Sequence, residues 1–164
     1  MPTLLEEYQR SELSKRPSKA QNAPTSQEVE TLIRDFKKFV RFEPKWIKEG
    51  SSPEMIEACE VLGCFMAPVN KSDNQALTKS QIRNVFGEIK RIQIKGFENE
   101  RKDFYLLKPK VAYNAGRHNK LGILVFKEYF NLAYACVENA SDYEHFCDFF
   151  EAILAYHKAY GGKD

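Results

Sequence analysis

The sequence contains few histidines, tryptophans and cysteines, and it lacks any long apolar run. Its 164 residues include three His, one Trp and four Cys. No stretch approaches the roughly 18 consecutive apolar residues that a membrane-spanning helix requires. The first ten residues are polar and include two glutamates, unlike a secretory signal. We therefore expect a cytoplasmic protein that has no membrane partner and keeps its cysteines as reduced thiols.

The cysteine spacing argues against a metal site. Four residues separate Cys59 from Cys64, and ten separate Cys136 from Cys147, so neither pair is a CxxC. His145 lies two residues before Cys147, and side chains at that spacing point to different faces of a helix. Free cysteine is common in protein cores. The sequence therefore predicts structural cysteines and no bound metal.

Catalytic motifs are also missing. The sequence has no GxSxG, no HExxH and no phosphate-binding loop. His157 lies near a predicted helix C-terminus, where a protonated imidazole would be favoured, and a packing or capping role is expected ahead of catalysis. Glu151 sits among apolar residues and could be tuned for acid–base work, but it could equally pair with Lys158 or cap a neighbouring helix. We therefore predict no catalytic residue and no cofactor.

Charge is distributed unevenly along the chain. The whole sequence carries a net charge of only +2. Residues 1–76 carry −1, residues 77–127 carry +8 and residues 128–164 carry −5. The middle segment has twelve Lys and Arg against four Asp and Glu. A basic segment of this kind favours a polyanionic partner.

Apolar residues recur at helical spacing through most of the chain after residue 25. The hydrophobic share of 43% is sufficient for a substantial core. No two alternating runs are joined by a hairpin signal. The sequence therefore predicts an all-α fold, a compact bundle of five or six helices that forms a single domain over residues 25–164.

Capping signals predict where several helices begin and end. Three of the predicted starts are Ser or Thr with Glu or Gln three residues later, and the fourth is Ser52 before a proline. In the segment Phe104–Arg117, Pro109 must either begin the helix or kink it. The predicted starts are Thr25, Ser52, Thr78 and Ser141, and the predicted ends are Gly96 and Gly161.

The first two dozen residues show no helical periodicity. Ser11 to Pro24 is rich in Ser, Lys and Pro. Such a composition offers little apolar surface to offset the entropy lost on ordering. We therefore expect residues 1–24 to be a flexible tail that is disordered unless a partner orders it.

Two predicted helices in the basic segment carry candidate RNA-binding residues. On the helix after Thr78, Lys79, Arg83 and Lys90 are separated by four and seven residues and form one stripe, and Arg91 adds a further charge. Cations at helical-turn spacing can contact successive phosphates of a nucleic-acid backbone.

The next helix places an aromatic ring between two cations. Lys110, Tyr113 and Arg117 are spaced by three and four residues, and Lys108 and Lys120 lie just outside either end. A ring can stack on an exposed base, although a core role for Tyr113 is equally compatible with the spacing. No set of Asn, Gln and Arg suited to reading base edges is apparent, so we expect sequence-independent binding. Solvated helix faces would also be rich in Lys and Arg, but a net +8 exceeds what solvation requires.

Several segments together resemble the small subunit of type III-A CRISPR–Cas (Csm) effector complexes. The combination and order are specific, whereas any one segment alone is not, and the resemblance spans residues from about Pro44 to the end. The segments are LTKSQIR and NVFGEIKRIQ at 77–93, LKPKVAYNAGR at 107–117 and FFEAILAYHKAYGGKD at 149–164, with further similarity at Trp46-Ile47 and Glu49-Gly50.

This resemblance implies a small, helical, non-catalytic protein that is present in several copies and stacks as a minor filament. Its implied partners are crRNA and target RNA, the repeat-type backbone subunits, the large subunit and further copies of itself. RNA cutting in such complexes belongs to the backbone subunit, and DNA cleavage belongs to the large subunit. Implied RNA contacts carry over to Arg83, Lys108, Lys110 and Arg117.

The leading hypothesis is thus a non-catalytic small subunit of a type III-A CRISPR interference complex in antiviral defence. It would bind the RNA backbone without sequence specificity and stabilise the assembly. One alternative is a helical protein–protein adaptor that has no direct RNA role and whose basic surface meets an acidic protein. The least favoured alternative is a nuclease that uses buried carboxylates.

Overall fold

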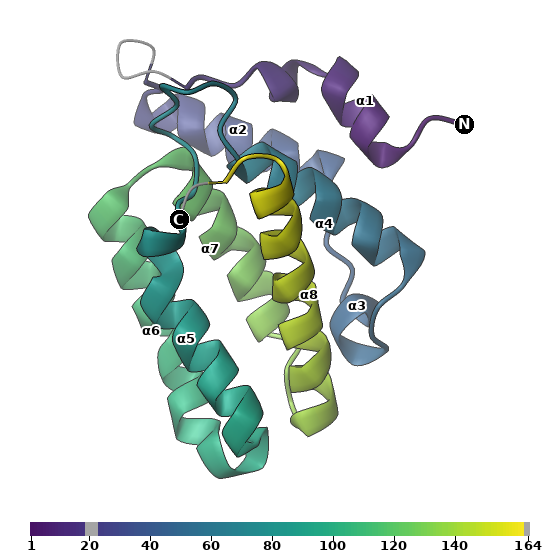
Figure 1. Ribbon diagram of the computed structural model, residues 1–164, viewed down its shortest axis with the longest axis vertical. Coiled ribbons are helices and arrows are strands. Elements are labelled where there is room, and N and C mark those ends of the chain that lie inside the picture. Colours follow the sequence, from purple (N-terminus) through teal and green to yellow (C-terminus); the bar gives the residue numbers. More distant parts are fainter. Residues whose placement is uncertain (19–22, 163–164) are drawn as a thin grey trace.

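Six long helices form the body of the protein in the computed structural model, which describes residues 1–18 and 23–162. They are α2 (Ser26–Phe39), α4 (Pro53–Met66), α5 (Lys79–Lys95), α6 (Arg101–His118), α7 (Leu121–Tyr134) and α8 (Ala140–Ala159). Figure 1 shows α5 to α8 running side by side, with α2 and α4 crossing one end of this group. The all-α prediction is confirmed.

Short helices that the sequence did not predict complete the described chain. They are α1 (Leu4–Arg10), α3 (Lys45–Lys48) and two 3₁₀ segments, Glu12–Lys15 and Phe97–Glu100. Within the described residues, no helix is long and apolar enough to cross a membrane.

The buried core is rich in aromatic rings, and α7 and α8 supply many of them. The rings of Phe130 and Phe146 meet edge to face with centroids 5.6 Å apart, and Phe146 also meets Phe150 at 4.9 Å. Edge-to-face contacts of this kind add to the apolar burial that stabilises the core. Helix α7 has buried residues around much of its circumference.

Most predicted helix boundaries are confirmed. Capping boxes are present at Thr25 and Thr78, and Ser52 caps α4 ahead of Pro53. Helix α6 continues through Pro109, so this proline does not begin the helix. Gly96 and Gly161 follow helix ends with φ of +98° and +97°, a conformation that glycine adopts without strain.

The predicted N-cap of the last helix, Ser141, is wrong by two residues, because the N-cap is Asn139. Helix α8 begins at Ala140, and the Asn139 side chain accepts a hydrogen bond of 2.9 Å from the backbone N–H of Asp142. Asn is as good an N-cap as Ser, and the acidic Asp142 in the first turn suits the positive end of the helix.

The structure also differs from the predicted tail over residues 1–24. Tyr8 on α1 is buried, and its ring meets Phe36 and Phe65 edge-on at 6.4 and 6.1 Å. The composition of this segment predicted disorder because it contains few apolar residues. One aromatic ring and one buried arginine order it nevertheless, because they pack on surfaces that the rest of the protein supplies. Residues 19–22 of the predicted tail lie outside the described residues.

The buried arginine is Arg16, and it bonds to the loop between α4 and α5. Its guanidinium lies 2.8 Å from the Asp73 carboxylate, and both side chains are almost fully buried. It also donates 2.9 Å hydrogen bonds to the carbonyls of Phe65 and Ala67. These three contacts hold residues near the N-terminus against the loop that leads into α5.

Helix α4 packs very closely on α8. A Cβ at Gly63 would lie only 2.6 Å from the backbone nitrogen of His157. The His157 ring is buried and lies with Nε2 2.7 Å from the Leu77 carbonyl oxygen. Burial lowers the pKa of His157, so the expected protonated imidazole at this helix end is not favoured.

A candidate nucleic-acid interface between helices α5 and α6

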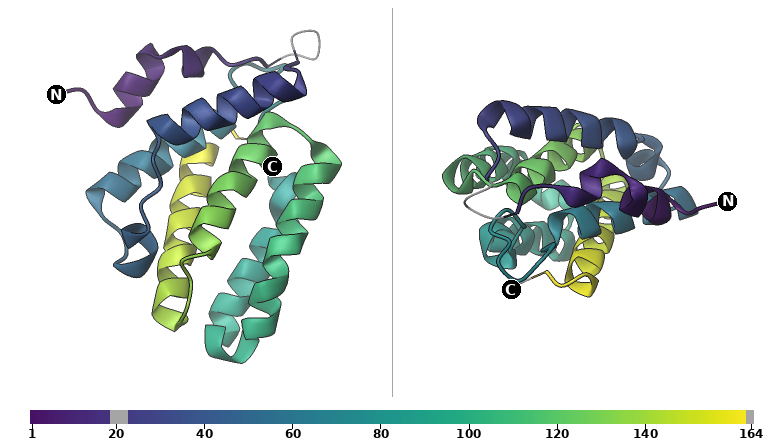
Figure 2. Two further views of the ribbon diagram at one scale, coloured as in Figure 1. Left: turned by 180° about the vertical axis from the view of Figure 1, so that it is seen from behind. Right: turned by 90° about the horizontal axis from the view of Figure 1, so that it is seen from above.

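A groove of about 740 Å³ lies between the first half of α5 and the second half of α6. The two helices are joined by a short connection, and they lie side by side in Figure 1 and in the left view of Figure 2. Their shared apolar face is buried in the core through residues such as Val85, Ile89 and Val111. The groove is lined by Arg83, Asn84, Gly87, Glu88, Leu106, Pro109, Lys110, Tyr113, Asn114 and Arg117.

Four of the nine predicted RNA-binding residues meet in this groove: Arg83, Lys110, Tyr113 and Arg117. Arg83 and Arg117 are exposed, and neither forms an ion pair or side-chain hydrogen bond with any residue that the structure describes. The Lys110 ammonium lies 3.8 Å from a Glu88 carboxylate oxygen, a loose contact on the surface. Two arginines from different helices are thus available to a ligand in one groove.

Tyr113 lies on the surface of α6 with 66% of its area exposed. The alternative that it belongs to the core is therefore wrong. Leu106 lies about two turns earlier on the same face and is also half exposed. An exposed ring beside an apolar side chain, between cations, is a surface on which an unpaired base can stack.

Arg91 is committed to a network of carboxylates within the protein. Its guanidinium lies 3.0 Å from Glu88, 3.4 Å from Glu100 and 2.6 Å from Asp103. The hydrogen bond from Arg91 lowers the pKa of Glu88, and the same partner lowers the pKa of Asp103. This network joins α5 to α6, so the charge of Arg91 is already balanced, and the residue lies outside the groove lining.

The other four predicted residues lie elsewhere. Lys90 points toward α8, where its ammonium is 3.3 Å from Glu151, so this acid pairs with α5. The Lys108 ammonium lies over the Tyr134 ring, 5.6 Å from its centroid. Lys79, at the start of α5, is exposed but is not part of the groove lining, and Lys120 lines a different groove.

Sequence reasoning missed the uncharged residues of the groove. Leu106 precedes Lys110 by four residues on the stripe that Tyr113 and Arg117 continue, so helical spacing could have found it. Gly87 follows Arg83 by one turn and leaves its wall of the groove without a side chain. Neither residue carries a charge or an aromatic ring, the two features that mark RNA-binding candidates in the sequence.

The described residues include no group of three or more His, Cys, Asp and Glu that could hold a metal ion. Burial raises the pKa of the Cys59 and Cys147 thiols to about 12. Both cysteines are buried and free, so they act as core residues. The acid of the groove, Glu88, is hydrogen-bonded to Arg91 and is held as a carboxylate.

A family model described as Csm2 Type III-A matches residues 60–163. This chain belongs to the type III-A Csm2 family. A Csm2 protein of Streptococcus thermophilus, described as "CRISPR system Cms protein Csm2", is 32% identical over 95 residues. That alignment covers 56% of this chain and 78% of the relative. No solved structure matches this chain.

The family match confirms the resemblance to a type III-A small subunit that the sequence motifs indicated. The Csm2 match contains both helices of the groove, α5 and α6, and it extends through α8. Helices α1, α2 and α3 precede the matched range, as do the family-like residues Trp46-Ile47 and Glu49-Gly50.

Proposed function

We propose that this Csm2-family chain is a non-catalytic small subunit that binds RNA through the α5–α6 groove and stabilises a type III-A interference complex in antiviral defence. The observation that carries the proposal is the convergence of Arg83 and Arg117, which have no partner in the described chain, on one groove. Lys110 and the exposed Tyr113 line the same groove. The proposed ligands are the phosphate backbones of crRNA and target RNA.

The groove chemistry supports binding without sequence readout. Cations that contact phosphates release counterions from RNA, and this contribution to affinity does not depend on base identity. Asn84 and Asn114 are the only amide side chains lining the groove among the described residues. Single contacts of this kind are weak, so assembly with backbone subunits, the large subunit and further copies would raise the effective concentration of each one.

A non-catalytic role is supported by the state of the ionisable groups. Glu88 is the groove's carboxylate, and its lowered pKa suits an ion-pair partner of Arg91 rather than a general acid. His157 is buried against a backbone carbonyl, away from the groove. Cleavage of RNA, if this subunit performed it, would need a group that neither residue supplies.

The test is RNA binding by the purified chain and by an Arg83→Glu/Arg117→Glu variant. Fluorescence polarisation with two labelled single-stranded RNAs of unrelated sequence should give similar affinities for the native chain, each falling as salt rises. The variant should bind both RNAs at least about tenfold more weakly and with a shallower salt dependence, because two phosphate contacts are lost.

The matched control is Lys95→Glu/Lys102→Glu, which makes the same charge change at exposed residues outside the groove. It should retain most of the native affinity. Equal losses in both variants would mean that overall charge, not this groove, sets binding. An undiminished affinity in the groove variant would favour the adaptor alternative, in which the basic surface contacts an acidic protein.

A further inference from the structure

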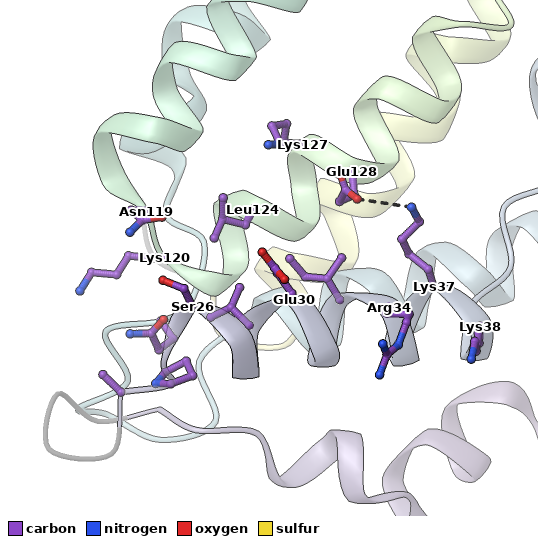
Figure 3. A pocket seen from close by; sticks show the side chains of 15 residues that line it. Ser26, Glu30, Arg34, Lys37, Lys38, Asn119, Lys120, Leu124, Lys127 and Glu128 are labelled. Atoms are coloured by element: carbon purple, nitrogen blue, oxygen red, sulfur yellow. Dashed lines mark hydrogen bonds and ion pairs between the residues drawn. The ribbon is translucent and has the colours of Figure 1, made fainter.

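A second groove, about 730 Å³ in volume, lies between α2 and the first half of α7. Figure 3 shows α2 forming one wall and α7 the other, with Asn119 and Lys120 at one end. At the other end, Lys37 of α2 reaches across to Glu128 of α7, with a nitrogen–oxygen distance of 3.3 Å. This ion pair bridges the two walls of the groove.

Cations outnumber acids along the groove. Arg34 and Lys38 lie on the α2 side, and Lys120 and Lys127 lie on the α7 side. Lys38, Lys120 and Lys127 form no ion pair or side-chain hydrogen bond with the residues that the structure describes, and Arg34 has only a 3.8 Å contact with its neighbour Asp35.

Among the described lining residues, only Glu30 and Glu128 carry negative charge, and Glu128 is already paired with Lys37. The half-buried side chains Val29, Ile33 and Leu124 supply apolar surface between the two rows of cations. A narrow surface with cations along both edges suits a strand of phosphates better than a compact anion.

The linings of the two grooves approach one another along the chain at the turn between α6 and α7. Arg117 lines the α5–α6 groove, and Asn119 and Lys120 line the α2–α7 groove. Lys120 follows Arg117 by three positions, so their Cα atoms lie within about 11 Å of one another. The linings of the two grooves are therefore close together at this turn, so that one extended strand could reach both.

We infer that the α2–α7 groove is a second RNA-backbone site, which extends the α5–α6 groove around the α6–α7 turn. The inference rests on the proposed RNA-binding function of the first groove. Helix α2 precedes the matched Csm2 range, so one wall of this site lies outside the part of the chain that the family model covers. The groove contains no aromatic ring among its described lining residues, so phosphate contacts dominate.

The test uses the full chain, two RNA lengths and one cation from each wall. In an Arg34→Glu/Lys127→Glu variant, binding of a ~20-nucleotide single-stranded RNA should weaken about tenfold, and its salt dependence should become shallower. Binding of an RNA of about 6 nucleotides, which can occupy the α5–α6 groove alone, should change less than threefold. The Arg83→Glu/Arg117→Glu variant should weaken binding of both lengths.

The outcomes separate the two proposals. Native affinity of the Arg34→Glu/Lys127→Glu variant for the long RNA would overturn the second site and leave the α5–α6 groove standing. Native affinity of the Arg83→Glu/Arg117→Glu variant would instead overturn the first groove. A poly-glutamate peptide could also bind the native chain but not the Arg34→Glu/Lys127→Glu variant, and fail to displace the long RNA. That result would assign the α2–α7 groove to a protein partner and overturn the inference.

Stability measurements complete the test. Arg34 is exposed and Lys127 is half buried, and neither forms a contact that holds the core together. An Arg34→Gln/Lys127→Gln variant removes the charges without reversing them and should show a smaller loss in the same direction. Melting temperatures within a few degrees of the native value would show that both variants fold. A neutral variant that folds and binds the long RNA like the native chain would also overturn the second site.

Discussion

Two helix pairs of this protein use glycine for opposite purposes. Gly63 lets α4 approach α8 until an added Cβ would collide with the backbone of α8. Gly87 of α5 and Gly116 of α6 would meet nothing within 4 Å of an added Cβ. The first glycine closes an interface that holds the fold, whereas Gly87 leaves the wall of a groove open. Glycine therefore permits close packing of α4 on α8 and keeps the α5–α6 groove open to a ligand.

The largest expected effect of breaking this contrast is at Gly63. Gly63→Ala should lower the free energy of unfolding by about 2–3 kcal/mol, because backbone atoms of α8 must move to admit the methyl group. Gly116→Ala, the matched control, should raise it by roughly 0.5–1 kcal/mol, since alanine is favoured over glycine inside a helix. Urea denaturation measures both, and equal stabilities would refute the close packing of α4 on α8.

An intermediate effect is expected at Tyr113, and its substitution tests whether the α5–α6 groove contacts RNA bases. Tyr113→Ala should weaken binding of single-stranded RNA about tenfold, the range found for loss of one base–aromatic stack. Tyr113→Phe should bind like the native chain, because the ring remains. Neither change should alter the melting temperature by more than a few degrees, since the side chain is 66% exposed. Weakened binding by the Phe variant would point to the hydroxyl instead of the ring.

The smallest expected effect is at Glu88, which reduces the net positive charge of the α5–α6 groove. Glu88→Gln should strengthen RNA binding about two- to threefold, because it removes one negative charge from the groove and releases Lys110. Arg91 keeps Asp103 and Glu100, so the link between α5 and α6 survives. Fluorescence polarisation at low salt detects the change, and a gain that persists at high salt would argue against a charge effect.

The long helices were predictable because local signals and packing agree. The capping boxes at Thr25 and Thr78, and the apolar stripes that follow them, place α2 and α5 correctly. The short helix α1 was not predictable in this way. Its stability comes from the contact of Tyr8 with Phe36 and Phe65, which are far along the chain. No periodicity within seven residues could reveal that surface.

The candidate site was predictable only in part, for a related reason. Helical spacing correctly grouped Lys110, Tyr113 and Arg117, because one helix determines their arrangement. Spacing also placed Lys90 with Arg83, but Lys90 is drawn to Glu151 on α8. Which cations remain available depends on acids contributed by other helices, and a single sequence does not show where those helices lie.

The ion pair between Arg16 and Asp73 makes residues near the N-terminus part of the unit that folds cooperatively. The match to the Csm2 family model begins at residue 60, so α1, α2 and α3 lie outside it. Yet Asp73 also accepts hydrogen bonds from the backbone of Val69 and Gln75, and it does so while buried against an arginine 57 positions earlier. Loss of that arginine would leave a charge stranded in the interior, a change that typically costs about 3–5 kcal/mol. The cooperatively folding unit therefore includes residue 16, although the match to the family model begins only at residue 60.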